Sequence, residues 1–369
     1  MRLIVVGSGI VGSACALAAS NLGADVTLVD ADHRGRATSA GAGIICPWAS
    51  RVEDRDWFAL ACAAARAYPE LIDLLADMGE TAVGYRKTGA MVLAESPERQ
   101  TEILEQLRAR HGDAPEMGTI ATLDPGQARG LFPPLNPDFY AVHISGGARV
   151  DGRLISSAMR RAAGRSGATV VAGEARLDMN GGRVRGVMVD DELIEADAVV
   201  AATGAWTNEF LAPAGLRIAI APQRGQIMHI GLGLTDTSQW PAILPGGTGH
   251  YMLAFDDSRV VAGATRETGS GFDYRVTPGG LAEVVGQALR VAPGLAAGTY
   301  IETRIGFRPM GPDIRPLLGP VPQAEGLVIA TGLGASGLTM GPYTGELAAR
   351  AALSADVPVD LAPFNPVRQ

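Results

Sequence analysis

The chain of 369 residues contains a single lysine, Lys87, so nearly all of its positive charge comes from arginine. A lysine Schiff base is therefore not expected, and a cationic group that binds a substrate should be an arginine. Lysine and arginine together number 31 against 39 aspartate and glutamate residues, which gives a formal net charge of −8. A chain this acidic is a poor nucleic-acid binder, because the phosphate backbone repels it.

Cysteine is also scarce, with only Cys15, Cys46 and Cys62 in the chain. An odd number of cysteines without a CxxC pair argues against a disulfide framework and against a zinc site. A reducing cytoplasm is the compartment that fits this usage best. No uninterrupted apolar stretch reaches the roughly 20 residues that a membrane span needs, so no span is expected.

The N-terminal region has the pattern of a βαβ unit that holds a dinucleotide. Residues 2–6 are a continuous apolar strand, residues 10–22 have helical length, and residues 25–30 form a second strand. Between the first strand and the helix stands a GxGxxG motif, made of Gly7, Ser8, Gly9, Ile10, Val11 and Gly12. Its glycines permit a tight turn, let the backbone approach a pyrophosphate and let helix and strand pack closely. Asp30 ends the second strand, where its carboxylate should accept hydrogen bonds from the adenosine ribose.

The rest of the chain alternates between helical and strand patterns without a clean linker. Helices are expected over residues 56–78, 97–111, 121–131, 151–166, 278–291 and about 340–353, and the small-residue stretch 35–47 is expected to be a loop. Short strands are expected at 89–94, 168–172, 197–202, 225–230, 250–255, 259–264 and 326–330, with a hairpin over 174–195. These patterns predict an α/β fold: a Rossmann-like cofactor domain (residues 1–80, 143–217 and 303–369) interleaved with a smaller α+β substrate domain built on an antiparallel sheet (residues 81–142 and 218–302).

The first unit alone does not distinguish NAD from FAD, but two later segments do. AVVAATGAW (198–206) is a buried strand ending in Ala-Thr-Gly, and GLVIATGLGASG (326–337) is a late strand followed by a glycine loop and a helix. In the order GSGIVG, TSAGAG, VVAATGAW, GFRPMGPDIRPLLG and GLGASGLTMGP, the chain resembles the glycine oxidase, D-amino acid oxidase and sarcosine oxidase superfamily of flavoproteins from residue 2 to about 350. The resemblance implies FAD as the cofactor. It also implies that FAD is held non-covalently, since similar enzymes with a covalent link use a cysteine near the C-terminal motif and none exists here.

The resemblance further implies which segments contact the cofactor. Residues 36–39 match the segment that binds the FAD phosphates and ribityl chain, and residues 41–45 match the segment lying along the flavin ring. Residue 175 matches the position whose backbone meets the adenine, and residues 332–339 match the loop that brings N–H groups and a helix N-terminus to the flavin N1/C2=O edge. The predicted cofactor set is Gly7, Gly9, Ile10, Val11, Gly12, Asp30, Ala31, Arg36, Thr38, Ser39, Gly41, Ala42, Gly43, Ile44, Ile45, Ala175, Ala202, Thr203, Gly204, Trp206, Arg308, Gly332, Gly334, Ala335, Ser336, Gly337, Leu338 and Thr339.

On the substrate side, the resemblance implies that Arg308 of the GFRP motif holds a substrate carboxylate over the flavin. A guanidinium suits a carboxylate because two parallel charge-assisted hydrogen bonds fix its orientation, although an ordinary ion pair is the alternative. Tyr251 matches a strand position near the substrate in similar oxidases, and a core tyrosine is the alternative there. Alternation puts Arg304 on the same strand face as Arg308, where it either reaches the site or closes a salt bridge.

Three further residues flank these positions. Arg266 follows the strand VVAGAT, and if it points inward the substrate should carry a second acidic or polar group; the alternative is a solvated strand end. Trp48 follows the flavin-facing loop and is expected to wall the pocket. Alternation turns His250 to the face opposite Tyr251, so it is not expected to be a catalytic base.

These assignments predict FAD-dependent oxidation of the Cα–N bond of an amino acid or amine with a carboxylate, of the D-amino acid, glycine or N-alkyl glycine type. Hydride transfer to flavin N5 would give an imine that hydrolyses to a keto acid. The acceptor is left open between oxygen and, in a D-amino acid dehydrogenase, a quinone or carrier; a homo-oligomer is left open too.

Two hypotheses from different classes compete with this one. An NAD-dependent Rossmann dehydrogenase would use the N-terminal unit, but it has no use for the two later segments. A non-catalytic FAD-containing subunit of a larger complex would use all three segments, but it does not require the intact GFRP motif. The sequence therefore favours the flavin-dependent enzyme over both.

Overall fold

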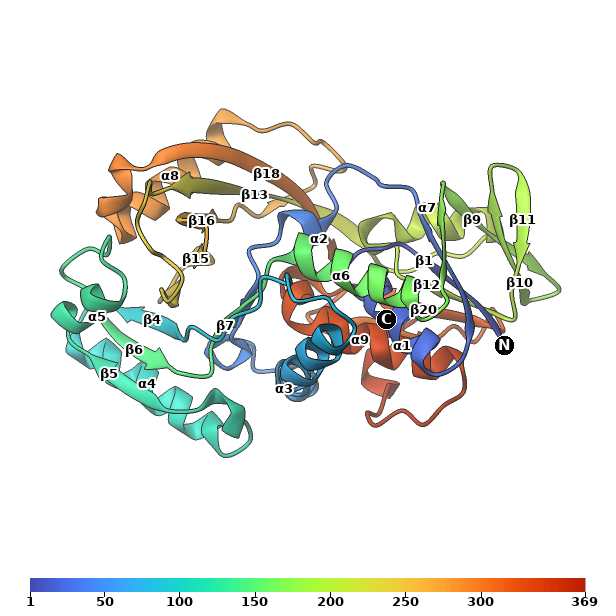
Figure 1. Cartoon of the computed structure of the whole chain (residues 1–369), viewed down its shortest axis with the longest axis horizontal. Helices are drawn as coiled ribbons and strands as arrows, with labels where there is room; N and C mark the ends of the chain where they lie inside the picture. Colours follow the sequence, from blue (N-terminus) through green and yellow to red (C-terminus); the bar gives the residue numbers. More distant parts are fainter. Residues whose placement is uncertain (369) are drawn as a thin grey trace.

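The computed structural model describes residues 1–368, and it builds them around two large β-sheets at opposite ends of the long axis of the molecule (Figure 1). The smaller of the two contains the N-terminal strand, and the larger contains the long strands of the second half of the chain. Among the described residues, none of the helices combines the length and apolar character needed to cross a bilayer.

The first sheet has six strands in the order β19-β20-β12-β1-β2-β8, all parallel except for the antiparallel edge pair β19 and β20. Its strands are β1 (Arg2–Val6), β2 (Asp25–Asp30), β8 (Thr169–Ala172), β12 (Ala198–Ala201), β19 (Leu317–Pro320) and β20 (Leu327–Thr331). Along β1, Leu3 and Val5 pack into one apolar cluster and Ile4 and Val6 into another. Successive side chains of a strand point to opposite faces, so both faces of this sheet are buried, which is why β1 has a continuous apolar sequence.

Helices cover one face of this sheet and a small sheet covers the other (Figure 1). The helices are α1 (Ile10–Asn21), α3 (Arg55–Asp77), α6 (Gly152–Arg165) and α9 (Gly337–Ala352). The other face carries β9 (Ala175–Asn180), β10 (Arg183–Val189), β11 (Glu192–Glu195) and the short α7 (Thr207–Leu211). Helices α1 and α9 approach closely because α9 has glycine at the contact: a Cβ on Gly345 would lie 2.3 Å from the carbonyl oxygen of Val11.

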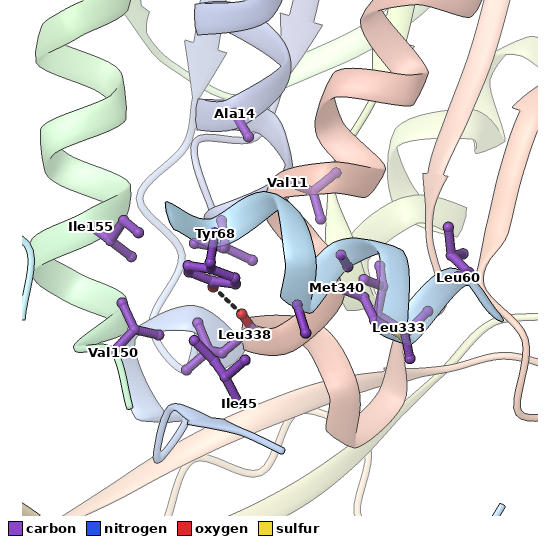
Figure 2. Packing of buried hydrophobic residues seen from close by; sticks show 14 of the residues in the cluster. Val11, Ala14, Ile45, Leu60, Tyr68, Val150, Ile155, Leu333, Leu338 and Met340 are labelled. Atoms are coloured by element: carbon purple, nitrogen blue, oxygen red, sulfur yellow. Dashed lines mark hydrogen bonds between the residues drawn. The ribbon is translucent and has the colours of Figure 1, made fainter. Parts of the chain in front are cut away.

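Tyr68 of α3 ties these helices to the start of α9 (Figure 2). Its ring is fully buried, near Val11, Ile45, Val150 and Ile155, and its hydroxyl donates a hydrogen bond to the carbonyl oxygen of Leu338. The start of α9 is therefore held in place from the core side.

The second sheet has nine strands in the order β17-β13-β16-β15-β14-β4-β6-β5, with β18 paired to the other edge of β13. Its neighbours are antiparallel except for β4 and β14, and its strands are β4 (Ala90–Ala94), β5 (Ile120–Leu123), β6 (Tyr140–Ile144), β13 (Ala221–Gly231), β14 (Ala242–Pro245), β15 (Tyr251–Phe255), β16 (Arg259–Gly263), β17 (Glu267–Thr268) and β18 (Thr299–Met310). Helices α5 (Pro125–Leu131) and α8 (Pro278–Val291) pack with one face of it in a second core, and α4 (Pro97–His111) lies beside β4 to β6.

The α/β fold with an antiparallel second sheet is confirmed, but two local predictions are wrong. The helix expected over 121–131 is a strand, β5, followed by α5, because Ile120–Leu123 pairs with β6 and a capping box at Asp124 starts the helix only at Pro125. The stretch 35–47 is not all loop: it contains α2 (Ala37–Ala40) and β3 (Ile44–Ile45), which pairs with β7 (Ala148–Arg149). The domain boundaries stay a prediction.

Candidate active site

A cavity of about 1970 Å³ runs from the carboxyl ends of β1, β2 and β12 to the inner face of the second sheet. Ordinary small-molecule pockets hold roughly 300–1,000 Å³. The volume is therefore sufficient for a dinucleotide and a substrate together. Crevices outside the carboxyl ends of parallel strands are where ligands bind in open α/β sheets.

The glycine turn after β1 is as compact as the GxGxxG motif predicts. Gly7 has φ +96°, and a Cβ there would lie 2.5 Å from the carbonyl oxygen of Ala202. A Cβ on Gly12 would lie only 1.7 Å from the carbonyl oxygen of Gly7. At the start of α1, the backbone N–H of Ile10 donates to Thr38 Oγ1 at 2.9 Å. The cavity thus has the N-terminus of a 12-residue helix as part of its wall, a setting that favours a phosphate.

Asp30 lies at the end of β2 and lines the cavity, as expected. Burial alone would raise the pKa of its carboxyl group, but hydrogen bonds from the backbone N–H groups of Ser8 and Asp32, together with Arg36, hold that pKa below its usual value. Asp30 is therefore ionised at neutral pH and able to accept hydrogen bonds.

The loop before α9 lies against the segment 41–45. The hydroxyl of Thr339 donates to the carbonyl oxygen of Ile44 at 2.9 Å, and a Cβ on Gly41 would lie 2.6 Å from Leu338 Cδ1. Gly334, within this loop, has a left-handed backbone with φ +52°. Two segments about 290 residues apart, both predicted to contact the flavin, are thus side by side on one wall of the cavity.

Most of the predicted cofactor set lines the cavity. These residues are Gly7, Gly9, Ile10, Val11, Asp30, Ala31, Arg36, Thr38, Gly41, Ala42, Gly43, Ile44, Ala175, Ala202, Thr203, Gly204, Trp206, Arg308, Gly334, Ala335, Ser336, Gly337, Leu338 and Thr339.

Four predicted cofactor residues are not among the lining residues. Gly12 is packed against Gly7, Ile45 is buried in the core, and Gly332 is packed against Leu317. Ser39 lines a smaller neighbouring pocket, and its carbonyl oxygen accepts a hydrogen bond from Arg153 Nε at 3.0 Å. Each of them supports a lining residue next to it in the sequence or across the turn.

Arg308 lies on β18 and is held from three sides. Its Nη1 donates to the carbonyl oxygen of Thr265 at 3.0 Å and to Gln223 Oε1 at 3.4 Å. The guanidinium also lies directly over Gly225 of β13, where a Cβ would lie 2.6 Å from Nη1 and Nη2. Burial lowers the pKa of Arg308 and the neighbouring Arg266 lowers it further, while Tyr251 opposes this shift.

Tyr251 and Arg266 line the same part of the cavity as Arg308. Burial raises the pKa of the Tyr251 hydroxyl, and the nearby Arg308 and Arg266 oppose this shift only in part, so the hydroxyl stays protonated at neutral pH. Arg266 is exposed to the cavity and packs against Gly249, where a Cβ would lie 2.8 Å from its Nε. Within residues 1–368, neither Arg266 nor Arg308 forms an ion pair with a carboxylate.

Arg304 shares the strand face of Arg308 but does not line the cavity. Four residues along a strand correspond to roughly 13 Å, which carries Arg304 beyond the site. There it pairs with Glu302 at 2.6 Å. Of the two roles that the sequence left open for Arg304, the structure therefore has the salt bridge.

His250 immediately precedes β15, which begins at Tyr251, and both residues line the cavity. The Nε2 atom of His250 lies 3.3 Å from Glu283 Oε1 of α8, the helix that packs with Met252 in the second core. The ring is therefore directed to the helix-covered face of the sheet, as alternation predicts, and the expectation that His250 is no catalytic base stays a prediction.

Trp48 lines the cavity, and its side chain is buried with Nε1 donating to Glu116 Oε1 at 3.4 Å. Cys46 lines the cavity too, and burial raises the pKa of its thiol to about 12. A thiol that stays protonated is a poor nucleophile, so Cys46 is not suited to forming a covalent bond with a flavin.

Sequence reasoning missed several lining residues. Gly225 is set by the register of β13 and β18, for which the sequence has no local signal, whereas Phe307 stands next to Arg308 in the GFRP motif. The loop 245–249 (PGGTG) also lines the cavity, and its glycine density was the available signal. Arg51 lines it as well, in a loop without a recognisable motif.

The residues present fit FAD. The turn at Gly7 leaves no room for side chains near the start of α1, Asp30 lines the cavity as an ionised acceptor, and the N-terminal end of α9 faces the cavity. Backbone N–H groups at two helix starts suit the two negatively charged parts of this cofactor, the pyrophosphate and the reduced ring.

Comparison with known proteins agrees with this geometry. The chain is 44% identical over 364 residues to the uncharacterized oxidoreductase YurR of Bacillus subtilis, covering 98% of both chains. Its fold superposes on iminodiacetate oxidase (IdaA) from Chelativorans sp. BNC1 with a TM-score of 0.96 at 49% identity, covering 99% of both chains. Glycine oxidase from Geobacillus kaustophilus superposes with a TM-score of 0.86 at 25% identity, covering 100% of this chain and 99% of that one. The model of the DAO family, described as FAD dependent oxidoreductase, matches residues 2–351. The chain therefore belongs to the DAO family of FAD-dependent oxidoreductases and binds FAD.

Proposed function

We propose that this enzyme oxidises a C–N bond of an N-substituted glycine that carries a second carboxylate, a substrate of the iminodiacetate type. The observation that carries the proposal is the pair Arg308 and Arg266, two neighbouring guanidinium groups that line one cavity and form no ion pair with a carboxylate of the described chain. Two neighbouring cations raise each other's free energy, and an anionic ligand relieves this repulsion. A substrate with two carboxylates is the simplest ligand that neutralises both.

The similarity to iminodiacetate oxidase supports this substrate class. Iminodiacetate is a secondary amine with two acetate arms, so it carries one carboxylate on each side of the nitrogen. The matching structure covers 99% of both chains at 49% identity. Glycine oxidase, at 25% identity, supports the coarser class of amino acid or amine oxidation.

In this proposal Arg308 and Tyr251 hold the first carboxylate. Arg308 is fixed by Thr265 and Gln223, so its fork needs little rearrangement on binding. Tyr251 stays protonated and donates its hydroxyl hydrogen to the same carboxylate. Arg266 binds the second carboxylate, which places the nitrogen and the reacting carbon between the two contacts.

The cofactor residues bind and orient the FAD. The GxGxxG turn and Thr38 hold the pyrophosphate, Asp30 the ribose, and residues 41–44 and 334–339 the ring, which is bound non-covalently. FAD, when bound, supplies the two-electron oxidation of the C–N bond. The chain supplies the carboxylate contacts that align the substrate with the ring, and Trp48 and the buried wall around it exclude water.

Anaerobic reduction of the purified holoenzyme tests the proposal. Iminodiacetate, N-methylglycine, glycine and D-alanine are added separately, and the visible flavin absorbance band is followed. Iminodiacetate is expected to bleach the band at the lowest concentration. Equal efficiency with D-alanine would contradict the substrate class, and failure of all four to bleach would contradict amino acid oxidation. Readmitting air or a quinone analogue to the reduced enzyme then identifies the acceptor by the rate at which the band returns.

A further inference from the structure

One part of the cavity lining comes from the loop before α3, the start and middle of α3, helix α4 and the glycine loop 246–249, and it is here called the vestibule. Its charged lining residues are Arg51, Glu53, Arg55, Arg66, Arg99, Arg110 and Asp113. Arginines thus outnumber carboxylates in the vestibule, although the chain as a whole carries a net charge of −8.

Arg51, in the loop before α3, is one of these cations. Its side chain is exposed and lines the cavity, and within residues 1–368 it has no ion pair or hydrogen bond. A Cβ on Gly247 would lie 3.8 Å from Arg51 Nη2, and a Cβ on Gly249 would lie 2.8 Å from Arg266 Nε. Two guanidinium groups therefore lie against the same short glycine loop, and neither has an ion-pair partner in the described chain. Arg51 lines the vestibule, and Arg266 lies at the proposed substrate site.

The backbone around Arg51 is fixed in spite of its loop conformation. Arg110 of α4 donates hydrogen bonds to the carbonyl oxygens of Trp48 at 2.8 Å, Val52 at 3.1 Å, and Ser50. The guanidinium of Arg110 also lies 5.1 Å from the centre of the Phe58 ring. Burial lowers the pKa of Arg110, because the charged form of the guanidinium loses contact with water where it hydrogen-bonds to the loop. The backbone from which the Arg51 side chain extends thus has a defined position.

We propose that Arg51 is an entry residue that favours substrates with two carboxylates, an inference that rests on the substrate class proposed above. Iminodiacetate has two carboxylates and a protonated amine at neutral pH, so it is a net anion, and a protein net charge of −8 slows its approach. A cation at the mouth of a cavity with low-dielectric walls raises the local concentration of anions and their association rate. Arg55 and Arg99 add to this field, but Arg99 is paired with Glu102 at 2.6 Å, and Arg55 stands between Asp54 and Asp56 in the sequence. Neither Arg51 nor Arg55 has an ion pair among residues 1–368, and Arg51 is the one that lies against the glycine loop that Arg266 also contacts.

The experiment compares Arg51→Gln with Arg217→Gln in the holoenzyme. Arg217 is a matched control, since it is an exposed loop arginine that lies outside the cavity and has no ion pair among the described residues, so both variants remove one charge. Steady-state kinetics are measured with iminodiacetate and with N-methylglycine, between about 0.01 M and about 1 M salt, where screening lengths run from roughly 30 Å to roughly 3 Å. Arg51→Gln is expected to lower kcat/KM for iminodiacetate about three- to tenfold at low salt, within the range of electrostatic steering.

Further measurements separate a role of Arg51 in substrate entry from a role in the chemical step or in the fold. The loss should appear in KM rather than kcat, shrink at high salt and be smaller for N-methylglycine. Arg51→Glu should double the effect on a logarithmic scale. Equal behaviour of the Gln variants at positions 51 and 217 would overturn the entry role, as would a loss of kcat that is independent of salt. If the parent enzyme oxidises neither substrate, the proposed function fails first, and that outcome is distinguishable from a failure of the entry role alone.

Discussion

At the end of the cavity near β1 the walls are mostly backbone, whereas at the end near β18 they are charged side chains. The first end depends on what is missing: Gly7, Gly9 and Gly12 leave the start of α1 open. The second depends on Arg308, Arg266 and Tyr251, which come from three different strands or strand ends of the nine-stranded sheet.

The difference separates two kinds of recognition. A backbone cradle binds a part that all FAD molecules share, so a short stretch of sequence is enough to build it. A cluster of guanidinium groups recognises charge and its spacing, and it depends on the packing of distant strands. The two ends should therefore respond differently to substitution, with loss of cofactor at one and loss of substrate affinity at the other.

The largest effect is expected from Gly12→Ala. The added Cβ would lie 1.7 Å from the carbonyl oxygen of Gly7 and 2.9 Å from its carbonyl carbon, and backbone atoms have nowhere to move. The variant should lose FAD and part of its thermal stability, which visible absorbance per protein and a melting curve would measure. Gly164→Ala is the control, since nothing lies within 4 Å of the added Cβ in helix α6. It should keep FAD and gain about 0.5–1 kcal/mol from the helix propensity of alanine.

Arg308→Gln should have the next largest effect, at the other end of the cavity. FAD content should stay near that of the parent, while KM for carboxylate substrates rises at least about 30-fold, because losing one partner of a buried charge pair costs roughly 2–5 kcal/mol. Arg304→Gln is the matched control: it removes the same charge from the same strand face but outside the cavity. An unchanged KM in Arg308→Gln, or an equal rise in Arg304→Gln, would contradict the role of Arg308 and with it the contrast between the two ends.

The two ends also differ in how far the sequence predicts them. At the cofactor end, GSGIVG and Asp30 lie within one βαβ unit, and the late loop adjoins its own helix, so local order was enough to predict which residues line the cavity. At the substrate end, Gly225 lies under Arg308 because β13 and β18 pair with Gln223 opposite Arg308 and Gly225 opposite Gly306. That register depends on how β13 and β18 pair in the folded protein, and no sequence feature near residue 225 predicts it.

Alternation gave mixed results for the same reason. It correctly put Arg304 and Arg308 on one face, but not within reach of one site, since distance along a strand grows by about 3.3 Å per residue. For His250 it predicted the face opposite Tyr251, and the ring contacts Glu283 of α8 on the helix-covered face. Periodicity therefore predicts the face of a side chain but not its distance from a site, which depends on packing that the sequence does not show.

Tyr251→Phe should have a moderate effect confined to the substrate end. Removing one hydrogen bond to a charged group costs about 1.5 kcal/mol at the lower end of its usual range, so KM should rise about tenfold with FAD content unchanged. Burial raises the pKa of this hydroxyl, so it remains a donor throughout the neutral range. The ratio of KM between variant and parent should therefore stay constant from pH 6 to pH 9, roughly the range below an ordinary tyrosine pKa. A ratio that changes within this range would show that Tyr251 loses its proton there and would contradict the assigned role.

The smallest effect on activity is expected from Glu80→Gln, which lies at neither end of the cavity. The buried Glu80 carboxylate accepts hydrogen bonds from Arg161 Nε at 3.0 and 3.1 Å and pairs with Arg165, and these contacts lower its pKa from the ordinary 4.5 to about 2. Because the folded-state pKa is the lower one, the stabilisation is complete above pH 4.5 and is lost as the pH falls towards 2. Both arginines are half exposed, so solvent screening limits the difference in unfolding free energy at pH 7 to about 1 kcal/mol. Urea unfolding of parent and variant across this pH range should show the difference shrinking with acid, while kcat, KM and FAD content match at pH 7. A stability difference that persists at low pH would contradict the ion-pair explanation, and a change in KM would show that side chains outside the cavity also set substrate affinity, which would weaken the contrast between its two ends.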